Sequence, residues 1–154
     1  MTFLLPQQTI FYQIEKALKR YRKLAQKTID RAGYGVSINQ VILLMNLKER
    51  PSANQAELAE LIFKDFASVT RMIDLMVKKG FVSRIESKED RRKKDLILTD
   101  LGNEMLENIT PLIQEYRMIA LDGFNPDEIN SAFDFLKRIT HNCEESTIKK
   151  TVES

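Results

Sequence analysis

The stretch that decides the fold is NQAELAELIFKDFASVTRMIDLMVKKGFVSRIESKEDRRKKDLILTDLG, residues 54–102. It opens with Asn54, followed three residues later by Glu57, a capping-box pattern that predicts the start of a short helix. Asp65 is a suitable N-cap for a second helix, which we expect over residues 66–79. Two short helices joined by a turn of a few residues are typical of a helix-turn-helix.

The second of these helices is expected to be amphipathic. At 3.6 residues per turn its apolar residues share one face, namely Phe66, Val69, Ile73, Met76 and Val77. On its other faces, hydroxyl groups can bond phosphates or base edges, an arginine can bind guanine, and a small residue allows close approach to a thymine methyl. The candidate DNA-contacting residues are Ala67, Ser68, Thr70 and Arg71. The alternative is an ordinary solvated helix face.

After Gly80 the hydrophobic period changes from helical to alternating. FVSRIES can alternate as a strand, and KDLILT places Leu96 and Leu98 on one face with Ile97 on the other. The SKEDRR segment between them has the length of a hairpin loop. A helix-turn-helix followed by a two-stranded hairpin is the winged-helix arrangement.

The predicted hairpin has a strongly charged tip. Its acidic residues are Glu86, Glu89 and Asp90, and its cations are Arg84, Lys88, Arg91, Arg92, Lys93 and Lys94. A charge run in isolation is usually solvated surface. Its position beside a helix-turn-helix favours DNA phosphate contacts, whose affinity falls steeply with salt.

Long helices are expected on both sides of this region. The first begins near Pro6 and ends at Gly33, and Ser37 with Gln40 predicts a second helix to about Glu49. Downstream, Thr99 is expected to cap a helix through about residue 121, bent at Pro111, and Asn125-Pro126 to open a last helix reaching at least residue 141. The fold class is therefore mainly α with a small β-hairpin.

Both terminal helices carry more apolar surface than one short winged helix can cover. The first has a stripe at Ile10, Ile14, Ala17, Tyr21, Leu24 and Thr28, and the last one at Ile129, Phe133, Leu136 and Ile139. Packing within one chain is the alternative, but this pattern favours a homodimer. A two-fold dimer would present two recognition helices about 34 Å apart, one turn of B-DNA.

Composition excludes several classes of protein. The 154 residues are 43% hydrophobic and 30% charged, which indicates a globular domain. No stretch approaches the roughly 18 apolar residues of a membrane span, and no signal peptide is evident, so we expect a cytoplasmic location without membrane contact. The single Cys143 excludes an internal disulfide, and its neighbour His141 is interpreted as incidental.

Nothing in the sequence indicates an enzyme. We find no nucleophile with a base partner, no histidine cluster and no glycine-rich phosphate loop, so we expect no catalytic residues, metal or cofactor. Charge is uneven along the chain. Residues 1–50 have a net charge of +6, residues 51–99 of +2 and residues 100–154 of −6. Such asymmetry is weak support for a nucleic-acid partner.

Taken together, these motifs resemble the MarR family of bacterial and archaeal transcription regulators. The resemblance is carried by ELAEL, SVTRMID, KKGFVSR, the Asp-x-Arg of Asp90 and Arg92, and LTDLG, in this order and spacing. It extends over about the whole chain and implies one domain over residues 1–154. Within it, residues 37–99 would form the winged helix-turn-helix, and residues 6–32 and 100–146 the dimerisation helices.

The resemblance also implies roles for individual residues. Recognition helices would enter successive major grooves of an inverted repeat, Arg92 would enter a narrow minor groove, and Asp90 would brace the wing by pairing with an arginine. The peroxide-sensing branch of the family uses a cysteine in the first helix, which this chain lacks. Phe63 and Lys64 stand where glycine and an apolar residue are commoner, so we expect this turn to differ locally.

Many members of the family release DNA when a small phenolic or lipophilic molecule binds between the dimer helices and the winged helix. Candidate residues on the corresponding segments are Phe11, Tyr12, Tyr34, Met45 and Tyr116. The alternative, that each is a core residue, is the favoured interpretation.

The leading hypothesis is a homodimeric repressor that binds an inverted-repeat operator and is released by a small effector. The alternatives are an activator without ligand control and a winged-helix module that binds protein. The basic wing and Arg71 favour DNA over the protein-binding alternative.

Overall fold

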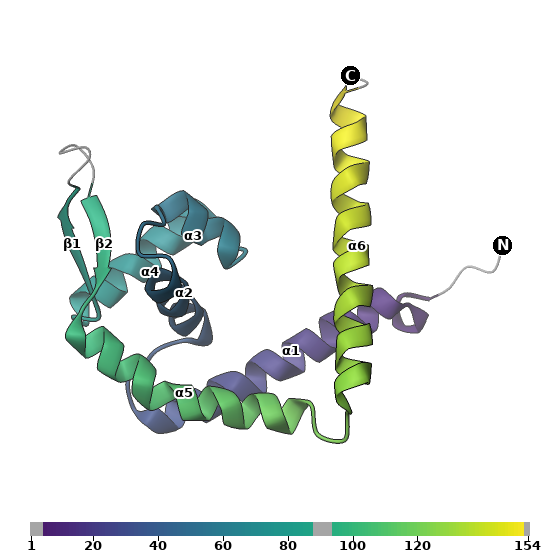
Figure 1. The fold of residues 1–154 in the computed structure, drawn as a ribbon, viewed down its shortest axis with the longest axis horizontal. Helices are drawn as coiled ribbons and strands as arrows, with labels where there is room; N and C mark the ends of the chain where they lie inside the picture. The colour runs from purple at the N-terminus through teal and green to yellow at the C-terminus, as the bar shows by residue number, and fades with distance from the viewer. Residues whose placement is uncertain (1–4, 88–93, 153–154) are drawn as a thin grey trace. The chain divides into compact units, whose positions relative to one another are not determined.

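The computed structural model describes residues 5–87 and 94–152 (Figure 1). The chain divides into two compact units, Met1–Arg117 and Met118–Ser154, and each is described by itself. The predicted fold class is confirmed, because the described elements are helices and a single two-stranded antiparallel hairpin.

The first unit begins with a helical segment that ends at a left-handed glycine. A 3-10 turn, η1 (Pro6–Gln8), precedes α1 (Ile10–Ile29), and a second 3-10 turn, η2 (Asp30–Ala32), follows it. Gly33 then has a φ of +75°, a conformation that glycine adopts without steric cost. The predicted end of the first helix is thereby confirmed.

The two capping boxes predicted from the sequence are both present. Helix α2 (Ile38–Glu49) starts with reciprocal hydrogen bonds between Ser37 and Gln40. Helix α3 (Gln55–Leu61) starts in the same way with Asn54 and Glu57. Each box satisfies backbone N–H groups that the first helical turn leaves without partners.

The turn after α3 has a phenylalanine at a position where glycine is commoner. Phe63 has a φ of +54°, the left-handed conformation that glycine would supply. The Phe63 N–H donates to the Glu60 carbonyl, and the Lys64 N–H to the Ala59 carbonyl, which is the hydrogen-bond pattern of a Schellman motif. Phenylalanine thus occupies the left-handed position of this turn, where its Cβ is strained and glycine would not be.

The second helix of the pair, α4 (Phe66–Lys78), is capped by Asp65 and followed by left-handed Gly80. Val69, Ile73 and Met76 are buried, as predicted from the helical period. Phe66 is an exception, since 59% of it is exposed. It lies in the first turn, where the helix has not yet reached the core.

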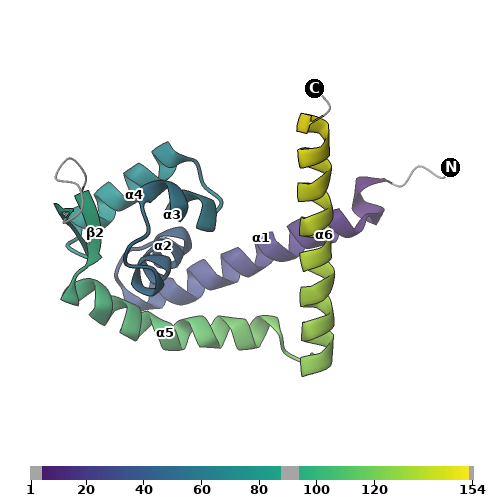
Figure 2. The same ribbon diagram turned by 45° about the horizontal axis from the view of Figure 1, so that its top comes forward.

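The hairpin consists of β1 (Val82–Glu86) and β2 (Lys94–Leu98), paired antiparallel with Val82 opposite Leu98. Leu96 is buried and Ile97 is exposed, which confirms the predicted alternation. Both views show the base of the hairpin near the end of α4 and the start of the next helix (Figures 1 and 2).

Helix α5 (Asp100–Ala120) continues through Pro111 and begins against the hairpin. The Thr99 hydroxyl accepts from the Gly102 N–H and donates to the Gly80 carbonyl, which fixes the start of α5 to the end of α4. A Cβ on Gly102 would lie 2.2 Å from the Phe81 carbonyl oxygen, so only glycine fits this close approach.

The core of the first unit draws on every helix from α1 to α5 and on both strands. Its largest fully buried side chains are Ile29, Leu43, Leu44, Leu47, Leu58, Ile73, Met76, Met105, Ile109, Val41, Val69 and Val82. Helix α4 and the hairpin therefore share one packed core, which fixes the position of each against the other.

The second unit is dominated by α6 (Pro126–Val152), which begins at Pro126 as predicted. Reciprocal hydrogen bonds between Asn125 and Glu128, which the sequence analysis did not predict, form a capping box there. Several of its large apolar side chains are exposed in the single chain, namely Phe133, Phe135 and Leu136. Across the described residues, no helix combines the length and hydropathy needed to cross a membrane.

Candidate nucleic-acid interface

A chain of hydrogen bonds organises the start of the recognition helix α4. The Asp65 carboxylate accepts from the Ser68 backbone N–H at 2.8 Å and from the Ser68 hydroxyl at 2.6 Å. The Ser68 hydroxyl in turn accepts from the Arg71 guanidinium at 3.1 Å. The single Ser68 hydroxyl hydrogen is thus committed to Asp65, and Arg71 is drawn toward the N-terminal end of α4.

The same contacts lower the pKa of Asp65. The main cause is the Ser68 hydroxyl that donates to the carboxylate, followed by the Ser68 backbone N–H, and the charge of Arg71 adds to both. Asp65 is exposed, and its lowered pKa keeps the carboxylate ionised as a cap while Arg71 presents the cation at the surface. The predicted contact residue Ala67 is also exposed beside them.

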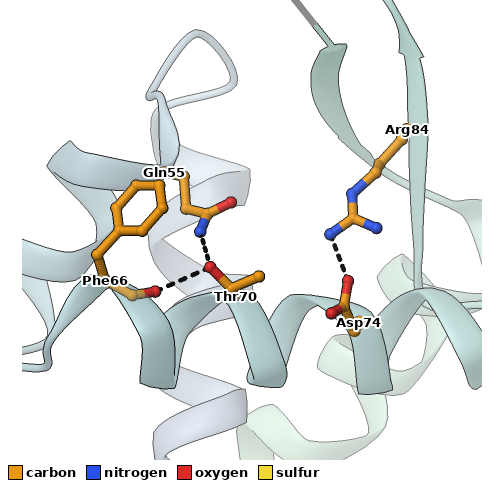
Figure 3. Close-up of polar contacts among 5 residues, drawn as sticks. All are labelled: Gln55, Phe66, Thr70, Asp74 and Arg84. Carbon is orange, nitrogen blue, oxygen red and sulfur yellow. Dashed lines mark hydrogen bonds and ion pairs between the residues drawn. The ribbon is translucent and has the colours of Figure 1, made fainter.

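Thr70 lies along the flank of α4 and is tied to two helices. Its hydroxyl donates to the Phe66 carbonyl at 2.9 Å and accepts a hydrogen bond from the Gln55 side chain of α3 (Figure 3). The predicted role of Thr70 as a hydroxyl donor to DNA would therefore require that it first give up Phe66.

An ion pair joins the recognition helix to the hairpin. The Arg84 guanidinium on β1 lies 2.5 Å from the Asp74 carboxylate on α4 (Figure 3). Both side chains keep access to solvent, at 33% and 54% exposed, so the pair positions the two elements more than it stabilises the fold.

The tip of the predicted wing lies outside the described residues. This applies to Lys88, Asp90, Arg91, Arg92 and Lys93, and hence to the expected pairing of Asp90 and the expected insertion of Arg92. Their roles stay predictions. Lys94, the first residue of β2, is exposed.

Two residues of this surface, Asp74 and Gln55, are not predicted as site residues by the sequence. Asp74 has one signal in the sequence, because Phe66, Thr70 and Asp74 recur at i, i+4 and i+8 and so form one row along α4. Gln55 looked like an ordinary first-turn residue of α3. No local signal indicates its contact, because Gln55 and Thr70 are 15 residues apart.

The C-terminal end of α4 is hydrogen-bonded to the linker between α1 and α2. The Lys79 ammonium donates to the carbonyls of Tyr34 at 3.1 Å and Gly35 at 2.8 Å. The Tyr34 ring packs edge-on against Phe81, and its hydroxyl accepts from Asn108 of α5 at 2.6 Å. Tyr34, a predicted effector-cleft residue, thus connects α4 to α5.

The other predicted cleft residues are spread over the first unit. Phe11 and Tyr12 are exposed on α1, whereas Met45 is half-buried in α2. Tyr116 is buried, with its ring 5.4 Å from that of Tyr21, and burial raises its pKa to about 12. Its packing is that of a core residue, which was the alternative interpretation.

A shallow groove of about 470 Å³ follows the exposed side of α1. Of the residues that the structure describes, Tyr12 is the one aromatic that lines it, and none of the other four cleft candidates borders it. The remaining lining residues are Glu15, Lys16, Lys19, Arg20 and Lys23. The groove is therefore basic and open, unlike the enclosed apolar sites that bind lipophilic molecules.

Comparison with known proteins agrees with this geometry. Residues 36–94 match the model of the MarR family. Over 126 residues the chain is 24% identical to YpoP, an HTH-type transcriptional regulator of Bacillus subtilis that is itself uncharacterised. That match covers 82% of this chain and 87% of the relative.

Solved structures extend the likeness to the terminal helices. A cysteine-to-serine variant of MarR from E. coli, in complex with operator DNA, superposes with a TM-score of 0.79 at 21% identity and covers 89% of this chain and 99% of that one. BpsR of Bordetella bronchiseptica, whose DNA binding is regulated by 6-hydroxynicotinic acid, reaches 0.81 at 19% identity and covers 90% and 98%. At these identities the likeness establishes a shared fold.

Proposed function

The chain belongs to the MarR family of transcription regulators, and we propose that it acts in the cytoplasm as a homodimeric repressor of an inverted-repeat operator. Members of this family regulate transcription by binding DNA and are not enzymes. What the proposal adds is the oligomeric state, the sign of regulation and the residues that contact DNA.

The observation that carries the proposal is the joint between α4 and the hairpin. Asp74 and Arg84 hold the recognition helix and the wing strand together through two exposed side chains, next to the exposed Arg71. Arg71 can bind a guanine or a phosphate, and the wing cations can contact the adjacent minor groove. Such a surface serves DNA better than a protein partner.

Exposed apolar side chains on both terminal helices support the dimer. In α1, Ile10 is 49% and Phe11 62% exposed, while the buried residues Ala25, Thr28 and Ile29 all lie in the last two turns. In the second unit, Phe133 is 66% exposed. Side chains of this size are rarely left in water in such numbers, so a second copy is the expected cover.

The proposal includes release of DNA by a small molecule. This release rests on the similarity to BpsR and on the contacts of Tyr34, which link α4 to α5. A ligand that displaced the Tyr34 hydroxyl from Asn108 would shift the Tyr34 carbonyl, to which Lys79 at the end of α4 donates, and so change the position of α4. An aromatic carboxylic acid is the natural first probe.

The function is tested by binding to the DNA immediately upstream of the gene. We expect a mobility shift at low salt, a dimeric mass by light scattering, and increased transcription from that promoter when the gene is deleted. Decreased transcription would instead identify an activator. Arg92→Ala should weaken binding to all sequences and lower the slope of affinity against salt by about one unit. The absence of any shift at low salt would contradict the DNA-binding role.

A further inference from the structure

Gln55 belongs to α3, yet its side chain ends on the surface of the recognition helix. Its amide nitrogen donates a hydrogen bond to the Thr70 hydroxyl, in the second turn of α4 (Figure 3). The side chain is half-buried. Gln55 therefore places a side-chain amide against the flank of α4, although Gln55 itself belongs to α3.

The hydrogen-bond network fixes which way the Gln55 amide faces. Thr70 has one hydroxyl hydrogen, and that hydrogen goes to the Phe66 carbonyl at 2.9 Å. In this arrangement the Thr70 oxygen accepts from Gln55, so the NH2 group of the amide is the end that faces Thr70. One N–H hydrogen and the carbonyl oxygen of Gln55 then remain for other partners.

Gln55 also borders a groove between the start of α3 and the hairpin. The groove holds about 230 Å³, and its cationic lining residues are Arg84 of β1 and Lys94 of β2. Among the described residues that line it, Asp95 is the one carboxylate. Arg84 is held by Asp74 through one of its five N–H donors, which leaves the others available. In the described part of this lining, nitrogen donors therefore outnumber carboxylates.

We propose that Gln55 donates its remaining amide hydrogen to a DNA backbone phosphate at the wall of the major groove that α4 enters, with Thr70 as its positioning residue. The proposal rests on the DNA-binding function proposed above. Successive helical residues are about 100° apart, so Thr70 faces the groove wall when Arg71 faces its floor. The first helix of a helix-turn-helix crosses the backbone, and phosphate is a frequent partner of glutamine side chains.

The first test compares affinities by fluorescence anisotropy on the upstream duplex and on a mixed-sequence duplex. We expect Gln55→Ala to weaken binding to both by the same factor, about tenfold, because a backbone contact carries no sequence information. The slope of affinity against salt should stay at the wild-type value, since a neutral side chain releases no counterion. Gln55→Glu, which has the same shape but places a carboxylate at the phosphate, should bind more weakly still.

The role of Thr70 is tested by its coupling to Gln55. Thr70→Val keeps the shape and removes the hydroxyl, so it should weaken binding in the wild type and have no further effect beside Gln55→Ala. Thr70→Ser keeps the hydroxyl and is the matched control, with affinity near that of the wild type. A purely structural role for Thr70 would give additive losses, and additivity would overturn its assignment.

A chemical substitution in the DNA locates the contact. Replacing single phosphates of the upstream duplex with neutral methylphosphonates should reveal a position where Gln55→Ala costs nothing further. Unchanged affinity of Gln55→Ala would overturn the proposal, as would a loss confined to one base pair, which would make Gln55 a base reader. Failure of the wild-type protein to bind either duplex would refute the DNA-binding function itself, before any variant is compared.

Discussion

Asp74 of the recognition helix and Arg84 of the first wing strand form an ion pair with 2.5 Å between the charged atoms. The pair places a carboxylate on the surface that should meet polyanionic DNA. An uncompensated carboxylate there would repel phosphate, so its value depends on holding Arg84 and the hairpin in place. The direction in which DNA affinity changes when Asp74 is neutralised therefore distinguishes a positioning role from an effect of net charge.

Asp74→Asn should weaken DNA binding, even though it removes a negative charge from the DNA-binding face. The reason is that a neutral amide holds the Arg84 guanidinium, and with it the hairpin, more weakly than the carboxylate does. Unfolding should change by less than about 1 kcal/mol, because both partners are exposed. Anisotropy titration and urea unfolding measure the two effects. A gain in affinity would show that only the net charge matters.

Arg71→Ala should reduce sequence discrimination by about 1–3 kcal/mol, since the outward face of α4 is the one that reaches base edges. The measurement is the ratio of affinities for the upstream duplex and for a mixed-sequence duplex. Lys137→Ala on α6 is a charge-matched control that lies outside the predicted interface. An unchanged affinity ratio for Arg71→Ala would reduce its role to a phosphate contact.

Phe63→Gly should stabilise the fold by up to about 1 kcal/mol, because glycine adopts the left-handed conformation at position 63 without steric cost. The Phe63 ring is 89% exposed and contributes little packing. Phe63→Ala is the control, since alanine removes the ring and keeps the Cβ that causes the strain. Urea midpoints at a constant m-value measure the difference. Equal stability of the two variants would refute the strain.

Gly102→Ala should destabilise the protein by about 1–3 kcal/mol, because its Cβ would lie 2.2 Å from the Phe81 carbonyl oxygen. Relief of that clash requires the start of α5 to move away from the hairpin, so DNA affinity should fall as well. Glu104→Ala, an exposed position on the same helix, is the control. Thermal unfolding gives the stability, and a wild-type midpoint would contradict the close approach.

Acid should remove a stabilising contribution of Asp65. Its folded-state pKa is lowered by Ser68, so this contribution is complete above the unfolded value, about 3.9 for aspartate, and is lost as pH falls through the lower folded value. Asp65→Asn keeps an N-cap and cannot titrate. Its stability should therefore fall less steeply below about pH 4 than that of the wild type. Parallel pH profiles would show that the Asp65 contacts are not maintained in solution.

Local chemistry explains how much of this protein the sequence predicts. Capping boxes at Ser37 and Asn54, the cap at Asp65, and the change from helical to alternating period after Gly80 each act within a few residues. Such signals determine where helices and strands begin and end. They were enough to place the helix-turn-helix, the hairpin and the candidate Arg71.

Tertiary structure alone decided the contacts between distant residues. Gln55 meets Thr70, Arg84 meets Asp74, and Lys79 meets the Tyr34 carbonyl only after α3, α4, the hairpin and the linker pack on a common core. Side-chain hydrogen bonds have no periodicity in the sequence, because each depends on the relative position of two elements. The sequence by itself determined a winged helix with a basic surface, and the packed fold determined which donors on that surface are already committed and which remain for DNA.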